Sequence, residues 1–302
     1  MKFSVQAWAP EYGPTAGQEL GEGDTVDVNP ELRESDWRPL AVGTDPAPEA
    51  LFVDGVRRVD ANLWIESPEG AIVLALAASY AAGAVLSNHR ATVIAEEVRR
   101  GIFTSAPNAE SVTTRYGDYQ VHLTEGDLPE KLWLGLQGQM SVLEGMVAAA
   151  HIDVPLIVVD GPLSHRRHVP GAVGYIKTQH VHYLPEPLRP ILGRLQAGER
   201  TPIFLIGGGA WNRLSWYAKL PLKSSTSVDG LIRAEVAAAD LDSARRVADL
   251  MTATILRFAS EAHKDPRAPQ NLYPIGGLER RLRHRLGDRE LMIRGLRRLA
   301  TS

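Results

Sequence analysis

The chain contains no cysteine among its 302 residues. Disulfide bonds, zinc sites built on thiolates and cysteine nucleophiles are therefore excluded, and a reducing cytoplasm is the expected compartment. An excess of one charge is also lacking, since 33 Lys+Arg stand against 36 Asp+Glu, for a formal net charge of −3. Hydrophobic residues at 44% and charged residues at 23% exclude a disordered chain and supply enough apolar material for a large core.

Long apolar runs are missing as well. A membrane-spanning helix needs about 18 apolar residues in a row, whereas the best run, Ala71 to Leu86, is shorter and broken by Ser79 and Gly83. The N-terminus has no apolar stretch of the length that a secretory signal requires. We therefore expect no membrane contact and no export.

The basic residues gather at the C-terminal end. Eight arginines stand between Glu279 and Leu299, opposed there only by Glu279, Asp288 and Glu290. A basic end on an otherwise acidic chain indicates contact with an anionic polymer or an acidic partner, and a solvated helix face is the alternative. Asp288 follows a glycine and is a suitable N-cap for a last helix.

Proline, glycine and acidic residues dominate residues 1–48, which we interpret as an irregular N-terminal arm ahead of one large domain at 49–302. Strand-like segments at 50–56, 59–66 and 70–85 then follow one another with short turns, which predicts an antiparallel meander. The next segment, 90–101, is compatible with a strand or a short helix, and 116–126 with a further strand.

A helix is predicted at 128–150, because its apolar residues recur at spacings of three and four. These residues are Leu132, Leu136, Met140, Leu143 and Val147. The run VPLIVVDG (154–161) is almost wholly apolar, which is typical of a strand buried on both faces. Further strands are predicted at 171–184, 202–208 and 224–237, and helices at 241–263 and in the arginine-rich end. The sequence thus predicts the α/β class, with a mixed sheet that opens with a meander and is flanked by helices.

Two of the apolar strands end in Asp-Gly. LFVDG delivers Asp54 and LIVVDG delivers Asp160, at points where a sheet stops and a cleft can begin. Two ordinary turns are the alternative, because Asp-Gly is a common turn signal. Glu144 lies four residues after Met140, close to the core-facing stripe, where a carboxylate needs a charged partner, a metal or a cleft. Three hard oxygen ligands favour Mg²⁺ or Mn²⁺, and two such ions about 4 Å apart can activate a water and stabilise the leaving oxygen of a phosphodiester.

The order strand-Asp, helix-Glu, strand-Asp after a meander is that of ribonuclease-H-like folds, and the chain resembles the NurA nuclease family. The resemblance rests on FVDGVRR, LEGMVAAAHIDVPLIVVDGPLS, GYIKTQHVHYL and LIRAEV, and runs from about Leu51 to the C-terminus. It implies a nuclease dependent on Mn²⁺ or Mg²⁺ that cleaves single-stranded DNA during DNA-end processing in repair. It also implies a homodimer that works with a hexameric HerA-type translocase ATPase.

Carried over residue by residue, the resemblance makes Asp54, Glu144 and Asp160 the metal ligands. The family also has a late helix, after a Tyr-Pro pair, that supplies a histidine near the metals. Here YPIGGLERRLRH has no histidine at the expected place. Glu279 is one candidate for completing the catalytic site, and His284, one turn later, is the other.

Five basic residues are candidates for holding the DNA backbone: Arg57, Arg166, Arg167, Lys177 and Arg233. Lys177 matches a recurrent lysine of the family, and a strand-end lysine that extends to water is its alternative. Arg233 stands two residues from Glu235 on one strand face, so a structural ion pair between them is its alternative.

Two departures from the family pattern favour a rival hypothesis. Val56 replaces the serine of the first motif, and the late histidine is missing. The rival is a non-catalytic adaptor that keeps the fold in order to dock an ATPase or DNA. It predicts that Asp54→Asn changes the melting temperature alone. A ribonuclease-H-like enzyme that acts on RNA or on a hybrid is the third hypothesis.

Overall fold

The structure is a computed structural model. It describes residues 24–177, 183–208, 211–221, 230–238, 240–261, 263–265 and 267–301, together with the backbone of Phe3–Val5. Residues 178–182 of the strand predicted at 171–184 and residues 224–229 of the strand predicted at 224–237 lie outside these residues, as does most of the arm before residue 24. None of the described helices combines the length and the apolar character that a membrane span requires.

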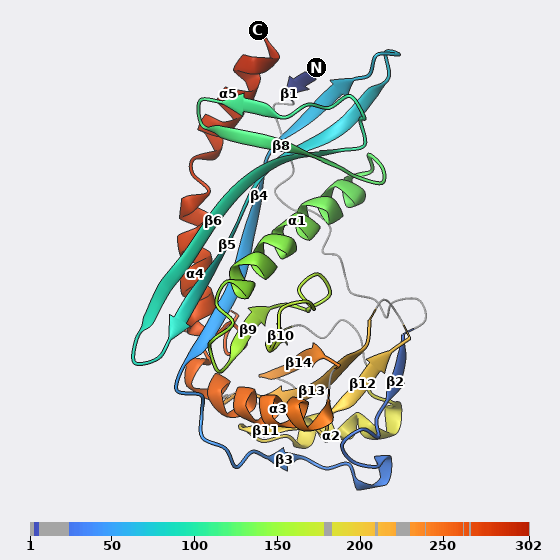
Figure 1. The fold of residues 1–302 in the computed structure, drawn as a ribbon, viewed down its shortest axis with the longest axis vertical. Helices are drawn as coiled ribbons and strands as arrows, with labels where there is room; N and C mark the ends of the chain where they lie inside the picture. The colour runs from blue at the N-terminus through green and yellow to red at the C-terminus, as the bar shows by residue number, and fades with distance from the viewer. Residues whose placement is uncertain are drawn as a thin grey trace.

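The described strands form one mixed sheet (Figure 1). They are β1 Phe3–Val5, β2 Thr25–Asp27, β3 Leu40–Ala41, β4 Ala50–Glu66, β5 Ile72–Ser87, β6 Ala91–Thr104, β7 Val112–Thr114, β8 Gly117–Leu123, β9 Ile157–Asp160, β10 Ala172–Ile176, β11 Glu199–Arg200, β12 Phe204–Gly207, β13 Arg213–Lys219 and β14 Leu231–Ala237. Their main order across the sheet is β2-β12-β13-β14-β10-β9-β4-β5-β6-β8-β7.

The described helices are α1 Pro129–Ala149, α2 Pro190–Arg194, α3 Leu241–Ile255, α4 Tyr273–Arg285 and α5 Arg289–Ala300, with 3-10 turns at Glu34–Asp36, Glu186–Leu188 and Leu256–Phe258. The α/β class predicted from the sequence is confirmed, with a mixed sheet flanked by helices. The helix predicted at 241–263 is shorter than expected, because α3 ends at Ile255. Asp288 caps α5 as predicted, since its Oδ1 accepts hydrogen bonds from the amides of Glu290 and Leu291.

The meander consists of β4, β5 and β6, which pair antiparallel along almost their whole length. The segments predicted as two strands at 50–56 and 59–66 form the single strand β4, with a register shift between Val59 and Ala61. The two charged residues at positions 57 and 58 separate the apolar segments, which led to the prediction of a turn between two strands. The strand nevertheless continues in its pairing with β5, and Arg58 is paired with Asp60 on the same strand, with N···O at 2.8 Å.

Strand β9 lies between β4 and β10 and runs parallel to both. Val53 of β4 stands opposite Val159 of β9. The next residues along the two strands are Asp54 and Asp160, so the register brings both carboxylates to the end of β9. The prediction that both strands end at Asp-Gly holds for Asp160 and is wrong for Asp54, because β4 continues through Gly55 to Glu66.

Helices α1 and α4 cover opposite faces of the meander (Figure 1). Val53 lies in one apolar cluster with Leu136 of α1, and Val56 lies in another with Leu278 of α4. Residues three apart on a strand point to opposite faces. Asp54 therefore shares the face of Val56 with α4.

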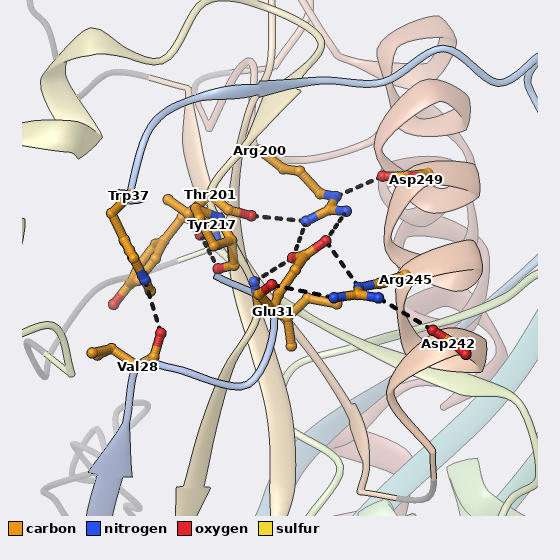
Figure 2. A network of polar contacts seen from close by, with 11 residues as sticks. Val28, Glu31, Trp37, Arg200, Thr201, Tyr217, Asp242, Arg245 and Asp249 are labelled. Carbon is orange, nitrogen blue, oxygen red and sulfur yellow. Dashed lines mark hydrogen bonds and ion pairs between the residues drawn. The ribbon is translucent and has the colours of Figure 1, made fainter. Parts of the chain in front are cut away.

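Part of the segment predicted as an irregular arm joins the sheet. β2 pairs with β12, and β3 pairs with β11. Between them, Glu31 enters a buried polar cluster (Figure 2). Its carboxylate accepts hydrogen bonds from Arg200 at 2.7 and 2.9 Å and from the amide of Ile203 at 2.7 Å. Arg200 also binds Asp249 of α3 at 2.6 Å, so the cluster fastens the arm to both β11 and α3.

We expect Glu31→Gln to lower the free energy of unfolding by about 3 kcal/mol at pH 7, because it leaves the buried Arg200 without its main partner. Burial raises the pKa of Glu31, but the hydrogen bond and charge of Arg200 outweigh it and hold the pKa below its usual value. A carboxyl group with a lowered pKa stabilises the fold above its unfolded pKa, and the contribution is lost as the pH falls through the folded value.

The difference between wild type and Glu31→Gln should therefore shrink as the pH falls below about 4. Urea unfolding at neutral and acid pH measures it, with the exposed Glu34→Gln as the control on the same arm. An equal loss of stability at both pH values, or an equal loss in the control, contradicts the expectation.

Candidate metal site

Three carboxylates from distant parts of the chain meet at the end of β9. Asp54 on β4, Asp160 on β9 and Glu279 on α4 each place one oxygen within 4.8 Å of the others. Asp54 and Glu279 are 5% and 8% exposed, and the Asp160 side chain is 18% exposed. Of the two candidates on the last helices, Glu279 joins the group and His284 is exposed outside it.

A close approach of α4 to the meander brings Glu279 to the site. Gly83 of β5 stands opposite Asp54. A Cβ atom at Gly83 would lie 3.0 Å from Leu278 and 3.2 Å from Leu282, so only glycine lets this helix pack so near. Glu279 follows Leu278 directly and is thereby carried to the edge where Asp54 lies.

Asp54 is the least satisfied of the three acids. Its Oδ1 accepts the amide of Gly55 at 2.7 Å, while its Oδ2 is buried and has no hydrogen-bond partner among the described residues. Burial raises the pKa of Asp54 well above its ordinary value, and the charge of Asp160 adds to the rise against the opposing charge of Lys177. A buried oxygen without a donor costs free energy, so the position suits a cation.

Lys177 and Arg267 supply positive charge to the group. Lys177 Nζ donates to Asp160 at 2.7 Å and to the side-chain oxygen of Asn271 at 2.8 Å. Arg267 donates to both oxygens of Glu279, at 3.0 and 2.5 Å. Burial raises the pKa of Glu279, but the hydrogen bond from Arg267 and the charge of Lys177 outweigh it, and the pKa falls below its usual value.

Three residues near the site, Asp265, Arg267 and Asn271, were not predicted from the sequence. Asn271 binds Asp265 at 2.6 Å as well as Lys177, and Arg267 binds both Glu279 and Asp265. All three missed residues stand in the connection directly ahead of α4. The sequence could have indicated them by their position just before a helix with a candidate ligand, because loops next to a rigid scaffold often carry functional groups.

Glu144 takes a different position from the one that the resemblance implied. It lies on α1, is 1% exposed and pairs with Arg166. It is absent from the group of three acids whose oxygens lie within 4.8 Å of one another, and the guanidinium of Arg166 engages its carboxylate. Its other oxygen, Oε1, lies 2.5 Å from the place of a Cβ atom at Gly55, on the opposite face of β4 from Asp54.

Of the five residues proposed to hold DNA, Lys177 is bound to Asp160 and Asn271, and the other four divide into two sets. Arg57 and Arg167 are exposed, and the Arg57 guanidinium lies 5.6 Å from the ring centre of Trp133. Arg166 and Arg233 are buried and held in ion pairs. Arg233 thus forms the structural ion pair that was its alternative role, with its Nη1 2.7 Å from Oε2 of Glu235.

The donor set fits a hard divalent cation. All three groups are carboxylates, one of them has a buried oxygen without a donor, and no sulfur or imidazole takes part. No protein-family model matches the chain, and no curated protein matches it either. The functional interpretation therefore depends on the geometry of this site.

We expect Gly55→Ala to lower the free energy of unfolding by about 1–3 kcal/mol. The new methyl group would lie 2.9 Å from Met140 and 3.0 Å from the carbonyl oxygen of Ala81, besides its overlap with Glu144. Gly138→Ala on α1 is the matched control, since a Cβ atom there meets nothing within 4 Å and alanine favours helix. Urea unfolding that gives equal stabilities for the two variants contradicts the close packing over Gly55.

Proposed function

We propose that the chain is a metal-dependent deoxyribonuclease with a ribonuclease-H-like fold, similar to the NurA family. The observation that carries the proposal is the meeting of Asp54, Asp160 and Glu279, with one buried Asp54 oxygen lacking a donor among the described residues. Like charges at this distance repel one another, so a cation that prefers oxygen ligands is the natural occupant.

Asp54, Asp160 and Glu279 would hold Mn²⁺ or Mg²⁺. An ion of this kind activates water for attack on a phosphodiester and neutralises charge on the leaving oxygen. The protein keeps the three ligands oriented: Asn271 fixes Lys177 against Asp160, and Arg267 fixes Glu279 through two hydrogen bonds. Burial of Asp54 keeps bulk water away from this side of the site.

Arginines near the carboxylates supply contacts for a DNA backbone. Arg57 and Arg283 are exposed, on β4 and α4 respectively. Burial of part of its side chain lowers the pKa of Arg57, the charge of Glu144 opposes that shift, and the charge of Arg283 adds to it. Exposed cations of this kind suit contacts with phosphates, and binding of DNA should weaken steeply as salt is added.

The wider setting follows the resemblance. We propose a homodimer that works with a hexameric HerA-type translocase ATPase on DNA ends, in the reducing cytoplasm that a cysteine-free chain favours. The adaptor hypothesis is the alternative, and the carboxylate cluster with its unmatched oxygen favours catalysis over it.

Matched labelled oligonucleotides test the proposal. Single-stranded DNA, RNA and an RNA–DNA hybrid of one sequence are incubated with the protein and Mn²⁺, with and without excess chelator. We expect cleavage of the DNA that stops on chelation. Cleavage of RNA or hybrid alone supports the third hypothesis, and cleavage that survives chelation contradicts a metal centre.

A further inference from the structure

Asp265 lies in the connection ahead of α4 and is 9% exposed. Its Oδ2 accepts a hydrogen bond from Nδ2 of Asn271 at 2.6 Å. Asn271 is fully buried, and its Oδ1 accepts a hydrogen bond from Lys177 Nζ at 2.8 Å. Lys177 in turn donates to Asp160 at 2.7 Å. Asp265 is thus joined to one proposed metal ligand through two side chains.

The same carboxylate is joined to a second proposed ligand. Oδ1 of Asp265 accepts a hydrogen bond from the backbone amide of Arg267 at 2.8 Å and lies 3.6 Å from its Nε. The guanidinium of Arg267 donates to both oxygens of Glu279, at 3.0 and 2.5 Å. One buried carboxylate therefore lies behind both Lys177 and Arg267, the two cations that engage the proposed ligands.

The charges on either side of Asn271 decide which way its side-chain amide is turned. An ammonium group only donates hydrogen bonds, and a carboxylate only accepts them. Asn271 therefore satisfies Lys177 and Asp265 together in one orientation, with its oxygen towards the lysine. The reverse orientation would place an NH₂ group against the ammonium. Asp265 thus keeps an acceptor in place for Lys177.

The connection also has anchors that do not involve the side chain of Asp265. Tyr175 of β10 is fully buried, and its hydroxyl donates to the carbonyl oxygen of Gln270 at 2.6 Å. The backbone amide of Asn271 donates to the carbonyl oxygen of Arg267 at 3.0 Å. A change of the Asp265 carboxylate should therefore leave the path of the chain in place and alter the side chains that this carboxylate orients.

We propose that Asp265 is a positioning residue of the metal site. It acts on Lys177 through Asn271. Its second route runs through Arg267 to Glu279. The inference rests on the proposed function, since it presupposes a cation among the three carboxylates. Without Asp265, the ammonium group of Lys177 loses its fixed acceptor and turns towards the three carboxylates, where it competes with a metal ion. Asp265 thereby raises the affinity of the site for the metal.

Calorimetric titration of the full chain with Mn²⁺ alone tests the inference without any substrate. Asp265→Asn has a single acceptor oxygen for the two groups that donate to the carboxylate. We expect it to bind Mn²⁺ about tenfold more weakly than wild type, in the range found for groups that act through a ligand. Glu261→Gln removes the same charge from an exposed position on the same connection and should keep the wild-type affinity.

The double variant Asp265→Asn/Asn271→Asp exchanges the two groups and keeps the net charge of the wild type. The amide at position 265 then donates to the carboxylate at position 271, and an oxygen again faces Lys177. We expect this variant to recover the wild-type Mn²⁺ affinity. A charge effect of Asp265 on the fold alone would not appear as a loss and recovery of metal binding.

A milder perturbation of the same pair comes from α4. A Cβ atom at Gly276 would lie 2.9 Å from Nδ2 of Asn271 and 3.3 Å from Oδ2 of Asp265. Gly276→Ala should therefore displace the end of the Asn271 side chain and weaken Mn²⁺ binding by a smaller factor. Gly277→Ala is the matched control, since a Cβ atom there meets nothing within 4 Å. These two variants decide the question if Asp265→Asn does not fold.

A purely structural role predicts a lower melting temperature in Asp265→Asn with unchanged Mn²⁺ affinity, and that result overturns the inference. A loss of affinity that the double variant does not recover also overturns it, as do equal affinities of Gly276→Ala and Gly277→Ala. Failure of the proposed function gives a different result, because the wild-type chain then does not bind Mn²⁺ at all and the role of Asp265 falls with the metal site.

Discussion

Asp54→Asn is expected to raise the melting temperature of the metal-free protein and to reduce Mn²⁺-dependent DNA cleavage by about 1000-fold. The carboxylate is buried, has one oxygen without a donor among the described residues, and lies within 4.8 Å of Asp160 and Glu279. Each of these features disfavours its charged form. Asparagine has the same shape, keeps an acceptor for the amide of Gly55 and removes the charge. A gain of about 1 kcal/mol corresponds to roughly 2 °C or more in a domain of this size.

The loss of cleavage follows from the loss of a ligand. A bound divalent ion contributes several kcal/mol to the stabilisation of a phosphodiester transition state, which is about three powers of ten in rate. Thermal melting and cleavage are measured on the same preparations. Asp153→Asn is the control, because Asp153 is exposed beyond the end of α1 and should change neither quantity. A more stable variant that cleaves as fast as wild type contradicts the role of Asp54, and a change in melting alone, with an inactive wild type, favours the adaptor.

Lys177→Met is expected to lower the free energy of unfolding of the metal-free protein by about 3 kcal/mol. Lys177 is 16% exposed at its side chain and is the ammonium group that faces Asp160. Without Lys177, Glu279 is still bound by Arg267. Asp160, however, loses the cation that donates a hydrogen bond to it. Methionine fills a similar volume, so the effect reports charge more than packing.

Mn²⁺ should restore most of that stability, because it supplies the positive charge that Lys177 provided. The gain in melting temperature on adding Mn²⁺ should therefore be larger for Lys177→Met than for wild type. Lys131→Met is the matched control: its ammonium group is exposed and faces Glu125 at 3.4 Å, a pair worth at most about 1 kcal/mol. Equal behaviour of the two variants contradicts the place of Lys177 as the counter-charge of the site.

Local patterns predicted the parts of the fold that short segments decide. The apolar stripe of α1 is buried as expected, with Leu136 and Leu143 at most 1% exposed. Asp54 and Asp160 come together because β4 and β9 pair in parallel with Val53 opposite Val159, although only β9 ends there and β4 continues to Glu66. β13, Arg213–Lys219, was missed, because its charged ends and short apolar centre give little periodicity.

The contacts that complete the site are not local, which is why the sequence left them open. Lys177 and Asn271 are 94 residues apart, and Glu144 and Arg166 are 22 apart. Periodicity placed Glu144 correctly on the buried side of α1, where a carboxylate needs a partner. It could not tell a metal from an arginine as that partner, because the choice depends on the path of the loop after β9. The same holds for Glu279 against His284, which only the packing of α4 on Gly83 decides.

Cleavage of a labelled single-stranded DNA with Mn²⁺, by wild type beside Asp160→Asn, tests the central claim most directly. The account predicts cleavage by the wild type and its loss in the variant, with both proteins folded by circular dichroism. Asp160→Asn that cleaves at the wild-type rate contradicts a metal centre built on Asp54, Asp160 and Glu279. No cleavage by either protein, even with a HerA-type partner added, contradicts the nuclease and leaves the adaptor.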